Sequence, residues 1–239
     1  MTFQYTQLDN SLAFIDLTLW ITGIVLTWLF VLFTTLSYSS KKNEMEKYQK
    51  ENIFTWILFL VCVGIANTLN IIWRFGITDT LIARIVEFLS QLILYMGILI
   101  KIINIERGIN RSDFYKGYYF SIIDAISAAY GVIIYPIITG VGILQIIYVI
   151  LSIAGFLVFP GIFIYMAIKT TGAARKKSLL VVFGAFLIGI GLFLQPQNIR
   201  NYIEGTPTFE MVNIIVTIIC PLFVLIGVVF IYISFKNTF

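Results

Sequence analysis

Ionisable and amide side chains recur inside long apolar stretches of this sequence, three or four residues apart. That spacing places them on one face of a helix. Carboxylate, guanidinium and amide groups gathered from several helices could bind a polar ligand or an ion, and such groups in apolar segments are functional candidates. The predicted ligand-binding set is Asp16, Asn67, Asn70, Arg74, Arg84, Glu87, Gln91, Gln145, Tyr148 and Asn213.

Two readings of this set remain open. The formal charges of its four ionisable members sum to zero, and Arg84 can pair with Glu87 three residues on. A polar ligand or an ion could therefore be held among them. Asn and Gln also join helices by hydrogen bonds worth roughly 0.6 to 2 kcal/mol, so the same residues could serve packing alone. Asp124 stands apart from the set and shares a helical face with Ser121.

Several kinds of chemistry are excluded by residue type. The sequence has no histidine, so it can form neither a Ser-His-Asp triad nor an HExxH metal site. Its two cysteines, Cys62 and Cys220, lie in apolar stretches and are too few for a four-cysteine zinc site. The sequence also lacks a pair of aspartates in a catalytic motif. We therefore expect no enzyme activity, no metal and no cofactor.

Composition indicates where the chain resides. Hydrophobic residues make up 59% of its 239 residues and charged residues 12%, about half the roughly 25% usual in soluble domains. A soluble surface must be largely polar, whereas a spanning helix needs about 20 apolar residues. We predict an all-α integral membrane protein. Its excess of basic residues is explained by their place in the loops at the membrane surface, so we expect no nucleic-acid partner.

Seven apolar runs are long enough to cross a bilayer as helices. They cover residues 12–38, 53–73, 81–103, 117–138, 141–168, 178–194 and 211–235. Membrane β-strands need only about ten alternating residues, so these runs are too long for a barrel. The sequence predicts one seven-helix membrane domain over residues 1–239, with kinks at Pro160 and Pro221.

The basic residues predict the orientation of the helices. Twelve of the sixteen fall in three alternate loops: Lys41, Lys42, Lys47, Lys50, Lys101, Arg107, Arg111, Lys116, Lys169, Arg175, Lys176 and Lys177. Because such residues are retained on the cytoplasmic side, the N-terminus is predicted outside and the C-terminus inside. Nearly all members of the ligand-binding set then lie in the outer half of the bilayer. We expect a polar cavity that opens outward, in a multi-pass protein of the cell membrane.

This layout resembles that of microbial rhodopsins and G-protein-coupled receptors. The last run, 211–235, has no lysine for a retinal Schiff base, so retinal is not expected. Over more of its length the chain resembles the seven-helix sensor region that precedes the kinase in some prokaryotic histidine kinases. The stretch Lys169-Thr170-Thr171-Gly172-Ala173-Ala174-Arg175-Lys176-Lys177, which leads into the apolar segment 179–194, carries that resemblance. It implies a sensor that, with no kinase domain in this sequence, would signal to a separate cytoplasmic partner.

Two other functions remain as alternatives. The chain could be a small transporter or ion pathway that uses Glu87 and Asp124 in opposite halves of the bilayer, or a structural subunit of a membrane complex. Polarity on the outer side and basic residues on the inner side favour the receptor-like sensor. The expected partners are membrane lipids, a small-molecule or lipid ligand, and a cytoplasmic signalling protein at the basic inner loops.

Overall fold

The fold is all-helical, as the sequence predicts. A computed structural model describes residues 10–77, 79–109, 117–130, 142–193 and 209–236, and these residues contain no strand. The elements are α1 (Asn10–Lys41), α2 (Lys47–Ile71), the π-helical turn η2 (Ile72–Gly76), α3 (Thr80–Ile109), α4 (Tyr119–Ala128), α5 (Gly142–Lys169), α6 (Gly172–Phe193) and α8 (Phe209–Lys236).

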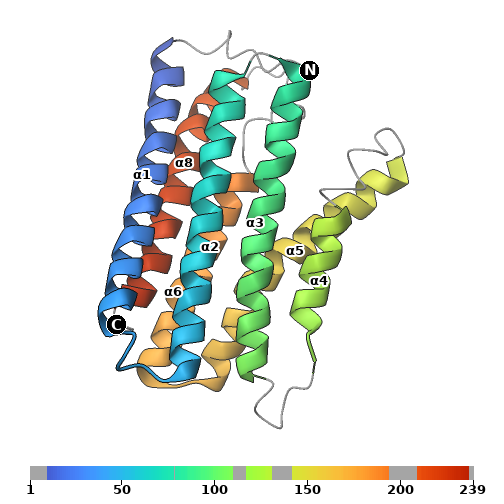
Figure 1. The fold of residues 1–239 in the computed structure, drawn as a ribbon. Coiled ribbons are helices and arrows are strands. Elements are labelled where there is room, and N and C mark those ends of the chain that lie inside the picture. Colours follow the sequence, from blue (N-terminus) through green and yellow to red (C-terminus); the bar gives the residue numbers. More distant parts are fainter. Residues whose placement is uncertain (1–9, 78, 110–116, 131–141, 194–208, 237–239) are drawn as a thin grey trace.

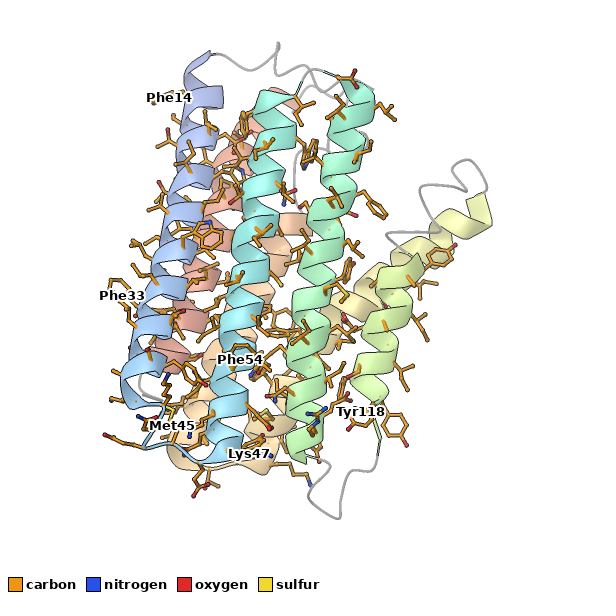
Figure 2. All side chains as sticks on the ribbon, viewed as in Figure 1. Phe14, Phe33, Met45, Lys47, Phe54 and Tyr118 are labelled. Carbon is orange, nitrogen blue, oxygen red and sulfur yellow. The ribbon has the colours of Figure 1, made fainter. Side chains whose placement is uncertain are left out.

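Among the described residues, four helices are long and apolar enough to cross a membrane, which indicates a multi-pass membrane protein. These segments are Phe14–Lys41, Lys47–Ile71, Leu81–Gly108 and Thr217–Ser234. Large apolar side chains also cover the outside of the bundle. Figure 2 shows Phe14, Phe33 and Phe54 pointing away from it, and they are 70%, 50% and 50% exposed. Water would disfavour such a surface, whereas lipid chains solvate it.

The helices form a closed ring. Each helix packs against its neighbours in chain order, and α8 returns to pack against α1. Figure 1 shows α1, α2 and α3 standing side by side with α8 behind them, while α4 and α5 cross more obliquely.

Glycines bring α6 and α8 into close contact. A side chain at Gly184 would place its Cβ 2.6 Å from the carbonyl oxygen of Gly227, and one at Gly191 would lie 2.6 Å from that of Cys220. No larger residue fits between these backbones without moving them. Small residues at such a contact are typical of membrane helix pairs.

Aromatic side chains fill the interior between α2 and α5. The rings of Phe59 and Phe159 stack 5.4 Å apart, and Trp56 lies 6.0 Å from Phe163. Ile102 of α3 is fully buried in the same cluster. At this level, therefore, packed side chains occupy the centre of the bundle.

Helix boundaries differ from the predicted spans at one end of the bundle. Helix α3 continues to Ile109, beyond the predicted end at residue 103, and α2 begins at Lys47 instead of residue 53. The expectation that Lys101 lies in a loop is wrong, because this side chain is 0% exposed within α3. Buried contacts of polar residues extend the helices past the points where the apolar runs end. Pro160 and Pro221 lie inside continuous helices.

Candidate functional site

A buried lysine joins α3 to α2. The Lys101 ammonium donates hydrogen bonds to the side-chain oxygen of Asn52 at 2.7 Å and to the backbone oxygen of Asn52 at 3.3 Å. The hydroxyl oxygen of Thr55 accepts a third at 3.4 Å. An ammonium has three N–H donors, so one residue of α3 binds three acceptors on the first turns of α2. Burial of a charge is tolerated only with such partners.

The same ammonium lies over an aromatic ring. Lys101 Nζ is 4.2 Å from the centroid of the Trp56 ring, well within the range of a cation–π interaction. Trp56 belongs to the aromatic cluster between α2 and α5. The lysine therefore connects the hydrogen-bonded group on α2 to the packed core.

A buried glutamate joins α3 to α4. Glu106 is 0% exposed, and its carboxylate accepts hydrogen bonds from the backbone N–H groups of Phe120 at 2.8 Å and Ser121 at 3.1 Å. The Ser121 hydroxyl donates a further bond to it. The first N–H groups of a helix have no partner within the helix, and a negative charge is stabilised there. Tyr118, the residue before α4, makes no capping bond with its side chain, so Glu106 caps α4 from a neighbouring helix.

A stripe of polar residues on α4 faces the bundle. Ser121, Asp124 and Ser127 are three residues apart and all buried. Ser121 contacts Glu106 on α3, whereas Ser127 lies against Gly155 of α5, where an added Cβ would be 2.7 Å from the serine Cβ. Asp124 thus lies on the face of α4 between α3 and α5. It is 1% exposed, and neither of its carboxyl oxygens has a hydrogen-bond partner among the described residues.

We call Asn52, Lys101, Glu106, Ser121 and Asp124 the polar cluster. Its members come from α2, α3 and α4 and lie toward the end of the bundle where α1 connects to α2. Figure 2 marks this end by Met45 and Lys47, at the bottom of the view. The cluster combines a fully hydrogen-bonded cation, a fully hydrogen-bonded carboxylate and a carboxyl group with no donor. Such an arrangement can hold the helices in fixed positions, and it can respond to a change in the charge of one of its members.

Part of the predicted ligand-binding set lies at the opposite end. Asp16 is buried on α1, and Asn67 and Asn70 are half-buried on α2. The Asn70 side-chain oxygen accepts a hydrogen bond of 2.9 Å from the indole N–H of Trp73. Glu87 is half-buried on α3. The side chains of the remaining members lie outside the described residues: Arg74, Arg84, Gln145, Tyr148 and Asn213.

Gln91 differs from the expectation for its set, because its side chain is exposed on α3. The preceding residue explains this rotation. Ser90 is buried, and its hydroxyl donates to the backbone oxygen of Ala66 at 3.1 Å. Because successive helical residues differ by about 100°, turning Ser90 toward α2 turns Gln91 away from it.

A small cavity lies between α1, α2 and α8, beside Trp20 and Asn67. Its volume is about 10 Å³, room for about one water molecule. Its lining also includes Gly23, Pro221 and Val224. This space suits a single ordered water better than a ligand, and ligand binding by the predicted set stays a prediction.

The main residues of the polar cluster are ones that sequence reasoning did not select. Lys101 and Glu106 were expected at or beyond the end of a span. A usable signal was present, since Ile98, Ile102 and Ile105 continue the helical apolar spacing past residue 103. Polar residues interleaved with that spacing indicate a helix that buries them. No protein-family model, curated protein or solved structure matches the chain.

Proposed function

We propose that this chain is a receptor-like membrane sensor of seven spanning helices, with its N-terminus outside the cell membrane and its C-terminus inside. A separate cytoplasmic partner would receive the signal. Support for the orientation comes from exposed basic residues at the ends of α1, α2, α5 and α6: Lys41, Lys47, Lys169, Arg175 and Lys176. Figure 1 shows these four helix ends at the same end of the bundle. Positive residues of this kind are retained on the cytoplasmic side.

One observation carries the proposal: α3 holds both of its neighbours by buried charges, at the basic end of the bundle. Lys101 binds α2 through Asn52, and Glu106, five residues on, binds α4 through Ser121. Hydrogen bonds to charged groups are short, directional and stronger than neutral ones. A helix that shifts must exchange them for another set, so the inner ends favour discrete positions over continuous drift. Discrete helix positions are what a sensor needs in order to pass a signal to its inner surface.

The packed interior supports a sensor over a transport pathway. A transporter needs polar groups that continue through both leaflets. In the described residues, the aromatic cluster around Trp56 and Phe159 fills the space between the polar cluster and the opposite end. The cavity near Asn67 has room for only about one water molecule. Under this proposal a small molecule or lipid binds the predicted set in the outer half, and no step of the function is enzymatic.

The experiment measures helix positions at the two ends separately. Spin labels at Ala173 and Tyr119, both exposed, report the spacing of α6 and α4 at the basic end. A second pair at Thr18 and Gly76 reports the opposite end. The protein is reconstituted in liposomes after Cys62 and Cys220 are replaced by alanine, and distances are measured by pulsed electron spin resonance. Glu106→Gln keeps the side-chain shape and removes the charge.

A sensor of the proposed kind responds to Glu106→Gln at one end only. We expect a second or shifted distance for the pair on α4 and α6, with an unchanged distance at the opposite end. Glu44→Gln, at an exposed glutamate between α1 and α2, is the matched control and should change neither. Unchanged distances at the basic end would contradict the proposal, and movement at both ends would favour a transporter.

A further inference from the structure

Asp124 is the unusual member of the polar cluster. Its side chain is 1% exposed, and within the part of the chain that the structure describes both carboxyl oxygens lack a hydrogen-bond partner. Glu106, the other buried carboxylate of the polar cluster, accepts hydrogen bonds from two backbone N–H groups and a hydroxyl. The two buried carboxyl groups, Glu106 on α3 and Asp124 on α4, therefore have opposite surroundings. An anion buried without donors or a counter-charge is strongly disfavoured.

The nearest hydroxyl groups on the stripe cannot donate to Asp124. Ser121, three residues before it, donates to Glu106, and Ser127, three residues after it, donates to the backbone oxygen of Ile123 at 2.8 Å. Each serine keeps oxygen lone pairs, which are acceptors and not donors. Beside Asp124, α4 therefore offers oxygen atoms without free protons. Oxygen ligands of this kind suit a hard cation and do not suit an anion or another acceptor.

We propose that Asp124 binds a small monovalent cation, either a proton on the carboxyl group or Na⁺ shared with the hydroxyl oxygen of Ser127, three residues on. Either cation neutralises the carboxylate and completes its bonding within the stripe. The proposal concerns the site alone and does not depend on the sensor function.

The described charged groups on the neighbouring helices have other surroundings. On α3, the Lys101 ammonium donates to Asn52 and Thr55 of α2, and the Arg107 side chain is exposed at the end of the helix. On α5, the described ionisable groups are Tyr165 and Lys169, and Lys169 Nζ lies 6.0 Å from the Tyr165 ring in the last turns of the helix. Glu106 carries the same sign of charge as Asp124. Among the described residues of the helices packed on α4, a bound cation is therefore the counter-charge that fits.

The test follows thermal unfolding of the purified full chain in detergent with a thiol-reactive dye. The dye reports unfolding through Cys220, which is buried, and Cys62, which is half-buried. One arm compares sodium chloride with choline chloride at equal ionic strength and high pH. The other arm lowers the pH in choline chloride alone. Asp124→Asn removes the charge, and Asp79→Asn makes the same change at an exposed carboxylate.

At a sodium concentration ten times the dissociation constant, a Na⁺ site raises the melting temperature of the wild-type protein by about 3 °C or more. A proton site raises it on acidification instead, because the folded state then holds the proton more tightly than the unfolded state does. Asp124→Asn should lose whichever response the wild type shows, and Asp79→Asn should keep it. Ser127→Ala should lose a sodium response and keep an acid response.

The proposal is overturned if wild type and Asp124→Asn respond alike in both arms. It is also overturned if the wild type responds in neither. Should Asp124→Asn fail to fold, Ser127→Ala still tests a sodium response, and the wild-type protein tests an acid response. Its infrared spectrum in choline chloride at high pH adds a direct reading, since a proton site predicts the carbonyl band of a protonated carboxyl group that ²H₂O shifts.

Discussion

At the scale of single residues, this chain places charges where a membrane helix can keep them only with partners. Lys101 and Glu106 are both 0% exposed, and each has its hydrogen-bonding groups matched by a neighbouring helix. Truncating one member of such a pair leaves the other buried and unsatisfied, which costs more than the bond contributes. The polar cluster should therefore be sensitive to single changes and tolerant of paired ones.

Lys101→Met tests this at the α2–α3 contact. The change keeps an unbranched side chain of similar length but removes the ammonium that donates to the Asn52 side-chain oxygen, so we expect a loss of about 1–3 kcal/mol in the free energy of unfolding. Adding Asn52→Leu should recover part of it, because both polar partners are then gone. Thermal melting in detergent measures both variants. Lys176→Met, at an exposed lysine, should change stability by less than about 0.5 kcal/mol. Equal melting temperatures for the two single variants would show that the buried ammonium stabilises nothing.

At the scale of helices, the sequence predicted the positions of the helices well and their ends less well. The apolar runs identified the helices because burial in lipid requires a long apolar segment. Their ends were missed where a polar residue is buried by another helix, as Glu106 is by the first turn of α4. The composition of one apolar run does not reveal such a partner, because only the fold brings Phe120 and Ser121 to Glu106. Asp124 was recognisable because it interrupts an apolar run, and Ser127, its companion on the stripe, was not.

The contact between α6 and α8 gives a second test at this scale. In Gly184→Ala the new Cβ would lie 2.6 Å from the Gly227 carbonyl oxygen, so the backbones must separate. Overpacking of this kind typically costs 1–3 kcal/mol. The same change at Gly23 of α1 meets nothing within 4 Å and should stabilise the helix by roughly 0.5–1 kcal/mol. The two melting temperatures should move in opposite directions. A Gly184→Ala protein as stable as Gly23→Ala would mean that the close contact is not maintained in the membrane protein.

At the scale of the whole molecule, signalling to a cytoplasmic partner requires that a defined end of the bundle lies inside the cell. The polar cluster and the exposed basic residues share one end of the bundle, and the sensor proposal places that end in the cytoplasm. Anionic headgroups bind such residues at about 1 kcal/mol each, so lipid contact and partner contact must be separated by experiment.

Neutralising Arg175, Lys176 and Lys177 to glutamine separates them. These residues open α6, where Arg175 and Lys176 are exposed. We expect the triple variant to insert normally, because the other basic residues at this end maintain the orientation, and to lose its cytoplasmic partner in cross-linking from intact membranes. The matched control neutralises Lys41, Lys42 and Lys47, which removes equal charge at the same end. Retention of the same cross-linked partner by the α6 variant would count against an output surface there.

Accessibility of single cysteines tests sidedness most directly. Lys47 and Gly76 flank α2, both are exposed, and a Cβ at Gly76 meets nothing within 4 Å. Each position is changed to cysteine in a background where Cys62 and Cys220 are alanine, and intact cells are treated with a membrane-impermeant maleimide. The proposed orientation predicts that Gly76→Cys reacts in intact cells and that Lys47→Cys reacts only after the membrane is opened. Reaction of Lys47→Cys in intact cells, or of both cysteines from one side, would contradict it.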